Sequence, residues 1–239
     1  MSVVADPSSV LIAHKFGGTS LATGERLAHV ARLIAARNEA QSVIVVSALK
    51  GSTDALIELA MRAGGRDRTW PDAWQALRQR HLEAAAGVRD VGRRNAVCDA
   101  LDAAFVGLRA QLDALAVLGI AVAEVLDAIQ GLGEVFSAQL LQAYLADAGI
   151  DADLLDAREV LTVRDAGTER TMRGVIDWQH SSTRLAQWRC AHHARHVLAT
   201  GYIARDSQGR ATTLGRNGSD YSGALFAALF EARELHIWT

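Results

Sequence analysis

A nine-residue turn near the end of the chain carries the residue types of an anion-binding site. Glycines let backbone N–H groups approach a ligand closely, and an arginine can grip a carboxylate or phosphate through two parallel hydrogen bonds. The apolar run 221–230 that follows predicts a helix, and the start of a helix favours negative charge. An ordinary capped turn with a solvated arginine fits the same pattern. The turn reads Thr212-Thr213-Leu214-Gly215-Arg216-Asn217-Gly218-Ser219-Asp220.

A second glycine turn lies near the start of the chain, where Lys15-Phe16-Gly17-Gly18 follows the apolar run Val10 to Ala13. This order predicts a strand that runs into a tight turn. Ligands of open parallel sheets bind at the carboxyl ends of the strands, which is where Lys15 would lie. Consecutive backbone N–H groups beside an ammonium group suit a phosphate, although a lysine at a strand end is more often a solvated surface charge.

Three motifs in a fixed order give the chain a family resemblance. They are KFGGTS at 15–20, GEVFS at 133–137 and TTLGRNGSDYSGA at 212–224. With them the chain resembles aspartate kinases, members of the amino-acid kinase superfamily, from about His14 to Thr239. The resemblance implies ATP-dependent phosphorylation of the side-chain carboxylate of L-aspartate to 4-phospho-L-aspartate. That reaction is the first step toward lysine, threonine and methionine.

The resemblance also implies roles for the charged residues. Lys15 would stabilise the transferred phosphoryl group, and Asp220 would orient Lys15, so these two are the expected catalytic residues. Glu134 would bind the ammonium group of aspartate and Arg216 its α-carboxylate. Each role has a plainer structural alternative, since Glu134 and Asp220 also suit the first turn of a helix.

Further positions follow from the same motifs. The aspartate site would also contain Thr53 and Ser219, with Ser47 nearby. Phosphate and nucleotide contacts would come from Lys15, Gly17, Gly18 and Thr239. Mg²⁺ would arrive with ATP, and no metal site made by the protein alone is expected.

Two alternatives to aspartate phosphorylation stay open at this point. One is another kinase of the superfamily, acting on glutamate, acetylglutamate or carbamate. The other is a non-catalytic fragment that keeps only the aspartate-binding half of the fold. The glutamate of GEVFS and the arginine of TTLGRNGSD favour aspartate.

Composition narrows the class of protein. The chain has 239 residues, of which 50% are hydrophobic and 22% charged, and its net charge is −2. It is long enough to bury one substantial core, and it lacks the basic surface typical of proteins that bind nucleic acid or membranes. Cys98 and Cys190 have no metal-ligand spacing, which favours a reducing compartment. We find neither a signal peptide nor an apolar run of about 20 residues, so we expect a cytoplasmic protein.

The periodicity of apolar residues predicts the fold class. Short apolar runs at 43–46, 197–199 and 235–238 predict buried strands, and Leu27, Val30, Ala31 and Ile34 line one face of a helix. Helical spacing between about 70 and 118 predicts two long helices packed as a hairpin, and the polar segment 200–214 predicts a β-hairpin. We therefore expect an α/β protein, a three-layer α/β/α sandwich with a mostly parallel sheet, which the resemblance identifies as the amino-acid kinase fold.

Two features depart from the family pattern. Asn217 stands where many relatives have a third glycine, a mild change because asparagine tolerates a left-handed backbone. The sequence also stops at Thr239, where relatives continue with residues that bind the nucleotide. We therefore expect residues 1–239 to form a single catalytic domain that is incomplete at its C-terminus and turns over little ATP alone. The longer protein would be a homo-oligomer, with or without regulatory or fused enzyme domains.

Overall fold

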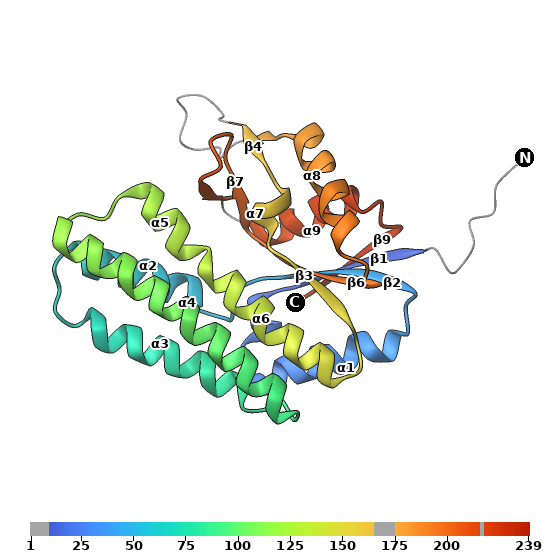
Figure 1. Ribbon diagram of the computed structural model, residues 1–239, viewed down its shortest axis with the longest axis horizontal. Helices are drawn as coiled ribbons and strands as arrows, with labels where there is room; N and C mark the ends of the chain where they lie inside the picture. The colour runs from blue at the N-terminus through green and yellow to red at the C-terminus, as the bar shows by residue number, and fades with distance from the viewer. Residues whose placement is uncertain (1–9, 165–174, 216–217) are drawn as a thin grey trace, which may run out of the picture.

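The computed structural model describes residues 10–164, 175–215 and 218–239 (Figure 1). A parallel five-stranded sheet, in the order β3-β6-β2-β1-β9, forms its centre. The strands are β1 (Leu11–Phe16), β2 (Gln41–Val46), β3 (Ala152–Leu155), β6 (His196–Thr200) and β9 (Glu234–Trp238). The α/β class with a parallel sheet is therefore confirmed, as are the strands expected at 43–46, 197–199 and 235–238.

Strand β1 extends further than the apolar run predicted. Lys15 and Phe16 belong to the strand rather than to the turn, since Lys15 pairs with Val45 on one side and with Ile237 on the other. A charged residue within a central strand is unusual because its side chain must enter one of the two buried layers. The partner of Lys15 in that layer is described below.

Helices cover both faces of the sheet, which completes the three-layer arrangement. In Figure 1, α1 (Gly24–Arg37) and α6 (Leu132–Asp147) lie below the sheet, and α7 (Ala157–Val160), α8 (Trp178–Ala191) and α9 (Gly218–Leu229) lie above it. Alternate residues of each strand serve the two layers. Ile44 and Val46 belong to the core between the sheet and helices α1 and α6. Val43 and Val45 belong to the core between the sheet and helices α8 and α9.

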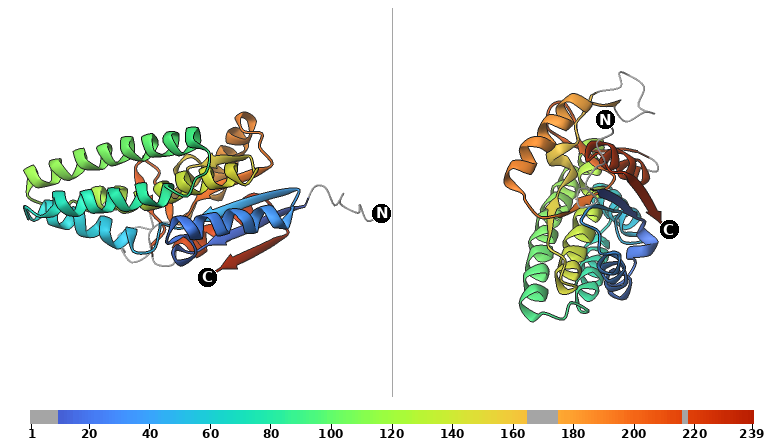
Figure 2. Two further views of the ribbon diagram at one scale, coloured as in Figure 1. Left: turned by 90° about the horizontal axis from the view of Figure 1, so that it is seen from below. Right: turned by 90° about the vertical axis from the view of Figure 1, so that its right-hand side faces the viewer.

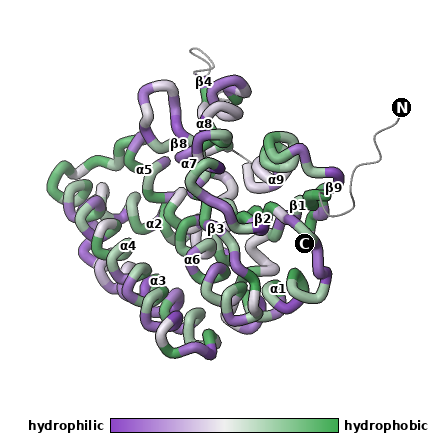
Figure 3. Tube along the Cα trace, turned by 45° about the vertical axis from the view of Figure 1, so that its right-hand side comes forward, coloured by the Kyte–Doolittle hydropathy of each residue, from purple (hydrophilic) through white to green (hydrophobic). Residues whose placement is uncertain are grey.

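Four helices extend the lower layer into a lobe. They are α2 (Ser52–Gly64), α3 (Trp70–Ala85), α4 (Val91–Leu118) and α5 (Ala123–Gln130). Figure 2 shows α3 and α4 running side by side away from the sheet. In Figure 3 hydrophilic and hydrophobic residues alternate along both helices, as expected for helices with one buried face. Asp90 accepts a hydrogen bond from the Arg93 N–H at the start of α4, and Gly119 ends the helix with a φ of 71°.

Short elements complete the chain. A 3-10 turn, η2 (Gly18–Leu21), follows β1, and a two-stranded ladder joins β4 (Val163–Arg164) to β5 (Val175–Ile176). The β-hairpin expected at 200–214 is confirmed as β7 (Ile203–Arg205) paired with β8 (Ala211–Thr213). No helix of the described ranges has both the length and the apolar character that a membrane crossing requires.

Strand β9 is fastened to β1 by aromatic contacts. The Trp238 ring stacks on Phe16 with 5.7 Å between ring centroids, and its indole N–H donates to Nδ1 of His14 over 3.2 Å. The other ring nitrogen of His14 lies 2.6 Å from the Glu39 carboxylate. Because Nδ1 accepts a hydrogen bond, the proton of a neutral His14 resides on Nε2 and is donated to Glu39. Burial lowers the pKa of His14 and favours this neutral form.

A buried histidine joins the helical lobe to the sheet layer. His81 of α3 packs between Phe105 and Phe136, its Nδ1–H donates to the Leu77 carbonyl over 2.8 Å, and its Nε2 accepts from the Ser52 hydroxyl over 3.4 Å. Burial lowers the pKa of His81 to about 4. The folded protein therefore holds this ring neutral and uses both nitrogens.

Protonation of His81 should contribute to acid unfolding. Its pKa is about 4 in the folded protein against an ordinary value of 6.5, so between these pH values the unfolded chain binds more protons and the free energy of unfolding falls as pH falls. His81→Gln should cost about 1–3 kcal/mol near pH 7, through lost packing and hydrogen bonds, and should show a smaller loss of stability between pH 6.5 and 4. Urea unfolding at several pH values measures both quantities. His29→Gln, on the exposed face of α1, is the matched control, and an unchanged acid dependence in His81→Gln would contradict the assignment.

Candidate functional site

The carboxyl ends of four neighbouring strands meet at one edge of the sheet. Backbone hydrogen bonds continue the strand pairing past the strand ends and hold the following loops together. The N–H of Ser47 donates to the Phe16 carbonyl over 3.1 Å, and that of Gly201 donates to Val46 over 2.8 Å. The N–H of Gly17 donates to the Trp238 carbonyl over 3.1 Å. This edge is where an open parallel sheet binds its ligands.

Lys15 and Asp220 form an ion pair at this edge. The ammonium group of Lys15, in β1, contacts the Oδ1 atom of Asp220, in the first turn of α9. Only 6% of the Lys15 side chain is exposed, compared with 54% of the Asp220 side chain. The buried ammonium is thus neutralised by a carboxylate that faces solvent, and an anion arriving from solvent would meet both groups.

Gly223 allows this pairing and was not identified from the sequence. A Cβ atom at position 223 would lie 3.0 Å from Cβ and 3.1 Å from Cγ of Lys15, tighter than ordinary contacts. A glycine there lets α9 approach β1 closely without displacing the Lys15 side chain. The available signal was the run of small residues Ser222-Gly223-Ala224 inside an apolar helix, which indicates close helix–strand packing.

The two glycines after β1 have different tasks. A Cβ atom on Gly18 would lie 2.7 Å from the Ala48 carbonyl, so a side chain at this position would displace the loop after β2. The Gly18 carbonyl accepts from the Lys50 N–H over 3.1 Å, which ties the two loops together. Gly17 has ordinary space around it, and the Lys15 ammonium would lie 3.6 Å from an added Cβ. Because the Gly17 N–H is bonded to Trp238, its contribution next to Lys15 is space rather than a free donor.

Glu134 is a buried acid facing the same loop. It lies in the first turn of α6 and is 3% exposed. Its Oε1 atom accepts from the Ala48 N–H over 3.2 Å, while Oε2 is buried and has no hydrogen-bond partner among the described residues. Burial raises the pKa of Glu134 to about 8. A carboxyl group with an unused buried oxygen is suited to a cationic ligand, which would stabilise its ionised form.

Ser137 fixes Glu134 in place. Its hydroxyl lies 2.7 Å from the Ser47 carbonyl and 3.0 Å from the Glu134 carbonyl, which joins α6 to the end of β2. The Ser47 hydroxyl is itself buried without a partner among the described residues. A second unpaired polar atom therefore lies in the loop that Glu134 contacts.

Thr53 and Ser219 begin two helices at the same edge. Thr53 is the second residue of α2, next to Ser52, whose backbone N–H donates to Leu49 over 2.8 Å. Ser219 is the second residue of α9 and lies against the end of β6, since a Cβ atom on Gly201 would be 3.4 Å from that of Ser219. Both side chains are half-buried.

The remaining expected residues divide into two cases. Thr239 follows β9 directly and is exposed, and the carbonyl of the preceding Trp238 binds Gly17, so Thr239 lies next to the glycine turn. Arg216 lies outside the described residues, as does Asn217. The structure thus brings together Lys15, Gly17, Gly18, Glu134, Ser219, Asp220 and Thr239 around one sheet edge, with Thr53 at the start of the adjoining α2.

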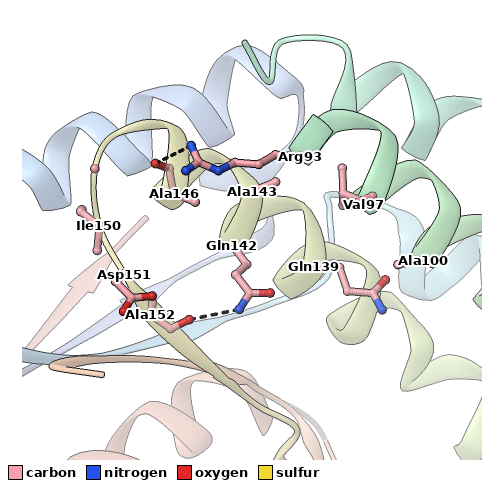
Figure 4. Close-up of a pocket in the computed structure, with 12 residues that line it drawn as sticks. Arg93, Val97, Ala100, Gln139, Gln142, Ala143, Ala146, Ile150, Asp151 and Ala152 are labelled. Carbon is pink, nitrogen blue, oxygen red and sulfur yellow. Dashed lines mark hydrogen bonds between the residues drawn. The ribbon is translucent and has the colours of Figure 1, made fainter. Parts of the chain in front are cut away.

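A cavity between α4 and α6 lies away from the residues described above. It has a volume of about 570 Å³, and Figure 4 shows Gln139 and Gln142 of α6 opposite Val97 of α4. Asp151 and Ala152 complete it, and Ala152 pairs with His196 at the amino end of β6. No expected site residue lines this cavity, which opens toward the opposite edge of the sheet.

The cluster of histidines around position 193 has ordinary structural contacts. His192 stacks on Trp188 with 4.0 Å between centroids, and its Nδ1 donates to the Trp188 carbonyl over 2.8 Å. His196 lies 2.8 Å from the Ser42 hydroxyl on the neighbouring strand. Within the described ranges, no three histidine, cysteine or acidic side chains lie close enough together to hold a metal ion.

A family model described as the amino acid kinase family matches residues 11–239. The chain belongs to this family. The chloroplastic bifunctional aspartokinase/homoserine dehydrogenase 1 of Arabidopsis thaliana is 34% identical over 226 residues, which span 95% of this chain and 24% of that protein. The bifunctional aspartokinase/homoserine dehydrogenase 2 of Escherichia coli strain K12 is also 34% identical, over 95% of this chain and 27% of its own length. The chain thus spans about a quarter of the length of these relatives.

Solved structures agree with the family assignment. Escherichia coli aspartokinase III in complex with lysine and aspartate superposes with a TM-score of 0.83 and 25% identity, over 96% of this chain and 49% of that one. The same enzyme with aspartate and ADP also gives 0.83 and 25%, over 97% of this chain and 49% of that one. The amino-acid kinase fold expected from the sequence is confirmed.

Ionisation of Glu134 should make stability depend on pH in the direction opposite to His81. The pKa of Glu134 is about 8 in the folded protein and 4.5 for an ordinary glutamate, so the folded state holds an extra proton between these values. The free energy of unfolding therefore falls as pH rises from 4.5 to 8. Glu134→Gln stays neutral, and its stability relative to the original protein should increase across this range.

Thermal unfolding at pH 5, 6.5 and 8 measures this difference. Glu25→Gln on the exposed surface of α1 serves as the control and should show no such trend. A stability difference between Glu134→Gln and the original protein that is constant with pH would show that Glu134 ionises normally in the folded state.

Proposed function

We propose that the complete protein uses ATP to phosphorylate the side-chain carboxylate of L-aspartate, which yields 4-phospho-L-aspartate. The observation that carries the proposal is the buried Lys15–Asp220 pair at the same sheet edge as the buried, half-satisfied Glu134. Support comes from relatives named aspartokinase and from the aspartokinase III structures that contain aspartate, one of them with ADP.

The charges of L-aspartate, the proposed phosphoryl acceptor, account for the buried carboxyl group of Glu134. Free aspartate carries an ammonium group and two carboxylates, and each must find an opposite charge when it leaves water. Glu134 offers a carboxylate oxygen without a partner to the ammonium group, and we assign the α-carboxylate to Arg216. Thr53 and Ser219 would supply hydroxyl groups around the same ligand.

Lys15 explains how transfer of the phosphoryl group is accelerated. Phosphoryl transfer places most of its demand on positioning and on neutralising the oxygens of the moving group. A buried ammonium held by Asp220 and facing the glycine turn meets that demand without reorganising solvent. The attacking carboxylate of aspartate is already ionised at neutral pH, so no side chain has to remove a proton from it.

The nucleotide would bind beside the glycine turn. Because Gly17 and Gly18 have no side chains, they leave space for a ligand next to Lys15. Thr239 lies beside this turn at the end of β9. Mg²⁺ would accompany ATP and neutralise phosphate charge when bound. We propose that residues 1–239 form one catalytic domain, and that the complete protein is a homo-oligomer in the route to lysine, threonine and methionine.

Ligand binding tests the choice of substrate. Calorimetry on this chain should show weak binding of L-aspartate, with little binding of L-glutamate or N-acetylglutamate, because the pocket must place a short side-chain carboxylate next to Lys15. Glu134→Ala should abolish the heat of aspartate binding, since it removes the partner of the ammonium group. A preference for either glutamate compound would overturn the assignment to aspartate, and an absence of binding by all three would favour a non-catalytic role.

Kinetics separate the roles of the two basic residues. In a catalytically active form of the protein, Arg216→Ala should raise the KM for aspartate with a smaller effect on kcat, because its two hydrogen bonds exist before and during the reaction. Lys15→Ala should lower kcat by about 10²–10³. Lys50→Ala, an exposed lysine in the neighbouring loop, is the control. Loss of aspartate binding with an unchanged kcat in Lys15→Ala would contradict its role in the transition state.

A further inference from the structure

A second cavity lies between α8 and the β7–β8 hairpin. Its volume is about 610 Å³, within the range of small-molecule sites. Gln179, Thr183 and Gln187 line it from successive turns of α8, and the hairpin loop 206–209 closes the opposite side. No residue of the candidate kinase site belongs to its lining. The cavity is therefore a separate feature of the molecule.

Two arginines line this cavity from different elements. Arg184 comes from α8 and Arg205 from β7, and both line the space. Burial and the nearby guanidinium of Arg205 lower the pKa of Arg184, as expected where two positive charges lie close together. Arg184 donates through Nε to the Glu159 carbonyl over 2.6 Å. The Nε atom of Arg205 is buried and has no hydrogen-bond partner in the described part of the chain.

Among the described acidic residues close to these arginines, two have other partners. Asp206 accepts from the Arg210 Nε over 2.7 Å, and its other oxygen accepts from the backbone N–H groups of Gln208 and Arg210. Asp177 is bonded to His180 over 2.9 Å and lies 3.4 Å from Arg164. Glu159 is exposed and interacts electrostatically with Arg184. None of these three carboxylates accepts a hydrogen bond from the Nε atom of Arg205 in the part of the chain that the structure describes.

We propose that this cavity binds a small anion with a carboxylate or phosphate group, held between Arg184 and Arg205. A guanidinium group presents N–H donors in a fork that matches both kinds of oxyanion. An anion there would relieve the repulsion between the two arginines and supply the acceptor that Arg205 Nε lacks. The amides of Gln179 and Gln187 and the Thr183 hydroxyl would complete its contacts. The proposal does not rest on the kinase function.

The anion would lie on an element that leads to the kinase site. Strand β8 continues from the hairpin through Leu214 and Gly215 to the start of α9, which carries Ser219 and Asp220. The Leu214 N–H donates to the Tyr202 carbonyl over 2.7 Å, and the Ser222 hydroxyl accepts from the Tyr202 N–H over 2.7 Å. These bonds join the base of the hairpin to α9.

Titration of the ¹⁵N-labelled chain with inorganic phosphate and with succinate tests the proposal, with potassium chloride holding ionic strength constant. One of the two probes should give saturable shifts of the amide signals of Arg205, Ser207 and Gln208. Which of them binds more tightly identifies the anionic group. The same titration of Lys15→Ala should leave these shifts unchanged while removing any shift at Gly17 and Gly18, so the two sites are distinguished.

Variants decide whether the arginines hold the anion. Arg205→Gln and Arg184→Gln should each weaken binding at least about tenfold, because each removes a charge-assisted hydrogen-bonding group. Arg32→Gln, an exposed arginine on α1, should bind as the original protein does. If Arg205→Gln fails to fold, the anion affinity of a folded Arg184→Gln protein decides the question. Shifts that do not saturate, or affinity unchanged in a folded Arg184→Gln protein, would overturn the proposal.

Discussion

A lysine ammonium group inside a protein must be neutralised, and this chain solves the problem with the carboxylate of Asp220 at the start of α9. The solution dictates much of the surrounding structure. Helix α9 lies against β1, where Gly223 leaves room for the Lys15 side chain, and β1 is an interior strand with β2 and β9 on its two sides. Backbone hydrogen bonds hold together the loops that follow these strands at their carboxyl ends. The loop after β2 contains Ala48, whose N–H donates to the buried Glu134. One charge pair thus links the packing of α9 in the upper layer to the strand ends where the candidate site lies.

The opposite ionisation behaviour of two buried groups sets the conditions under which this site is intact. Burial lowers the pKa of His81 and so makes the free energy of unfolding fall as the pH drops from 6.5 to 4, whereas burial raises the pKa of Glu134 and makes the free energy of unfolding fall as the pH rises from 4.5 to 8. A cation bound to Glu134 removes the second cost. The raised pKa of Glu134 is therefore a cost that a bound cation would offset, as expected where a charged group is held out of water.

The sequence predicted the sheet, the helix face formed by Leu27, Val30, Ala31 and Ile34, and the hairpin after β6, because each depends on a local period or turn signal. It did not predict that Lys15 lies within β1, since hydropathy ends the strand at Ala13 while pairing with β2 and β9 extends it. Gly223, Ser137 and His81 were missed for a related reason. Two of them lie inside the quoted motifs, but their roles are contacts between elements distant in the chain, and a local pattern does not show which distant element each residue contacts. The motifs identified Glu134, but only the structure showed that one of its oxygens lacks a partner.

The ion pair also joins the two ends of the sequence, with Lys15 in the first strand and Asp220 in the last helix. Strand β1 pairs with β2 early in the chain, but its other neighbour, β9, is the last strand. During synthesis on the ribosome, the ammonium group of Lys15 has no partner until α9 has left the exit tunnel, and the central strand has one open side until β9 follows. The Lys15–Asp220 pair is thus a contact of large sequence separation, so the entropy of closing almost the whole described chain is lost before these two charges can meet.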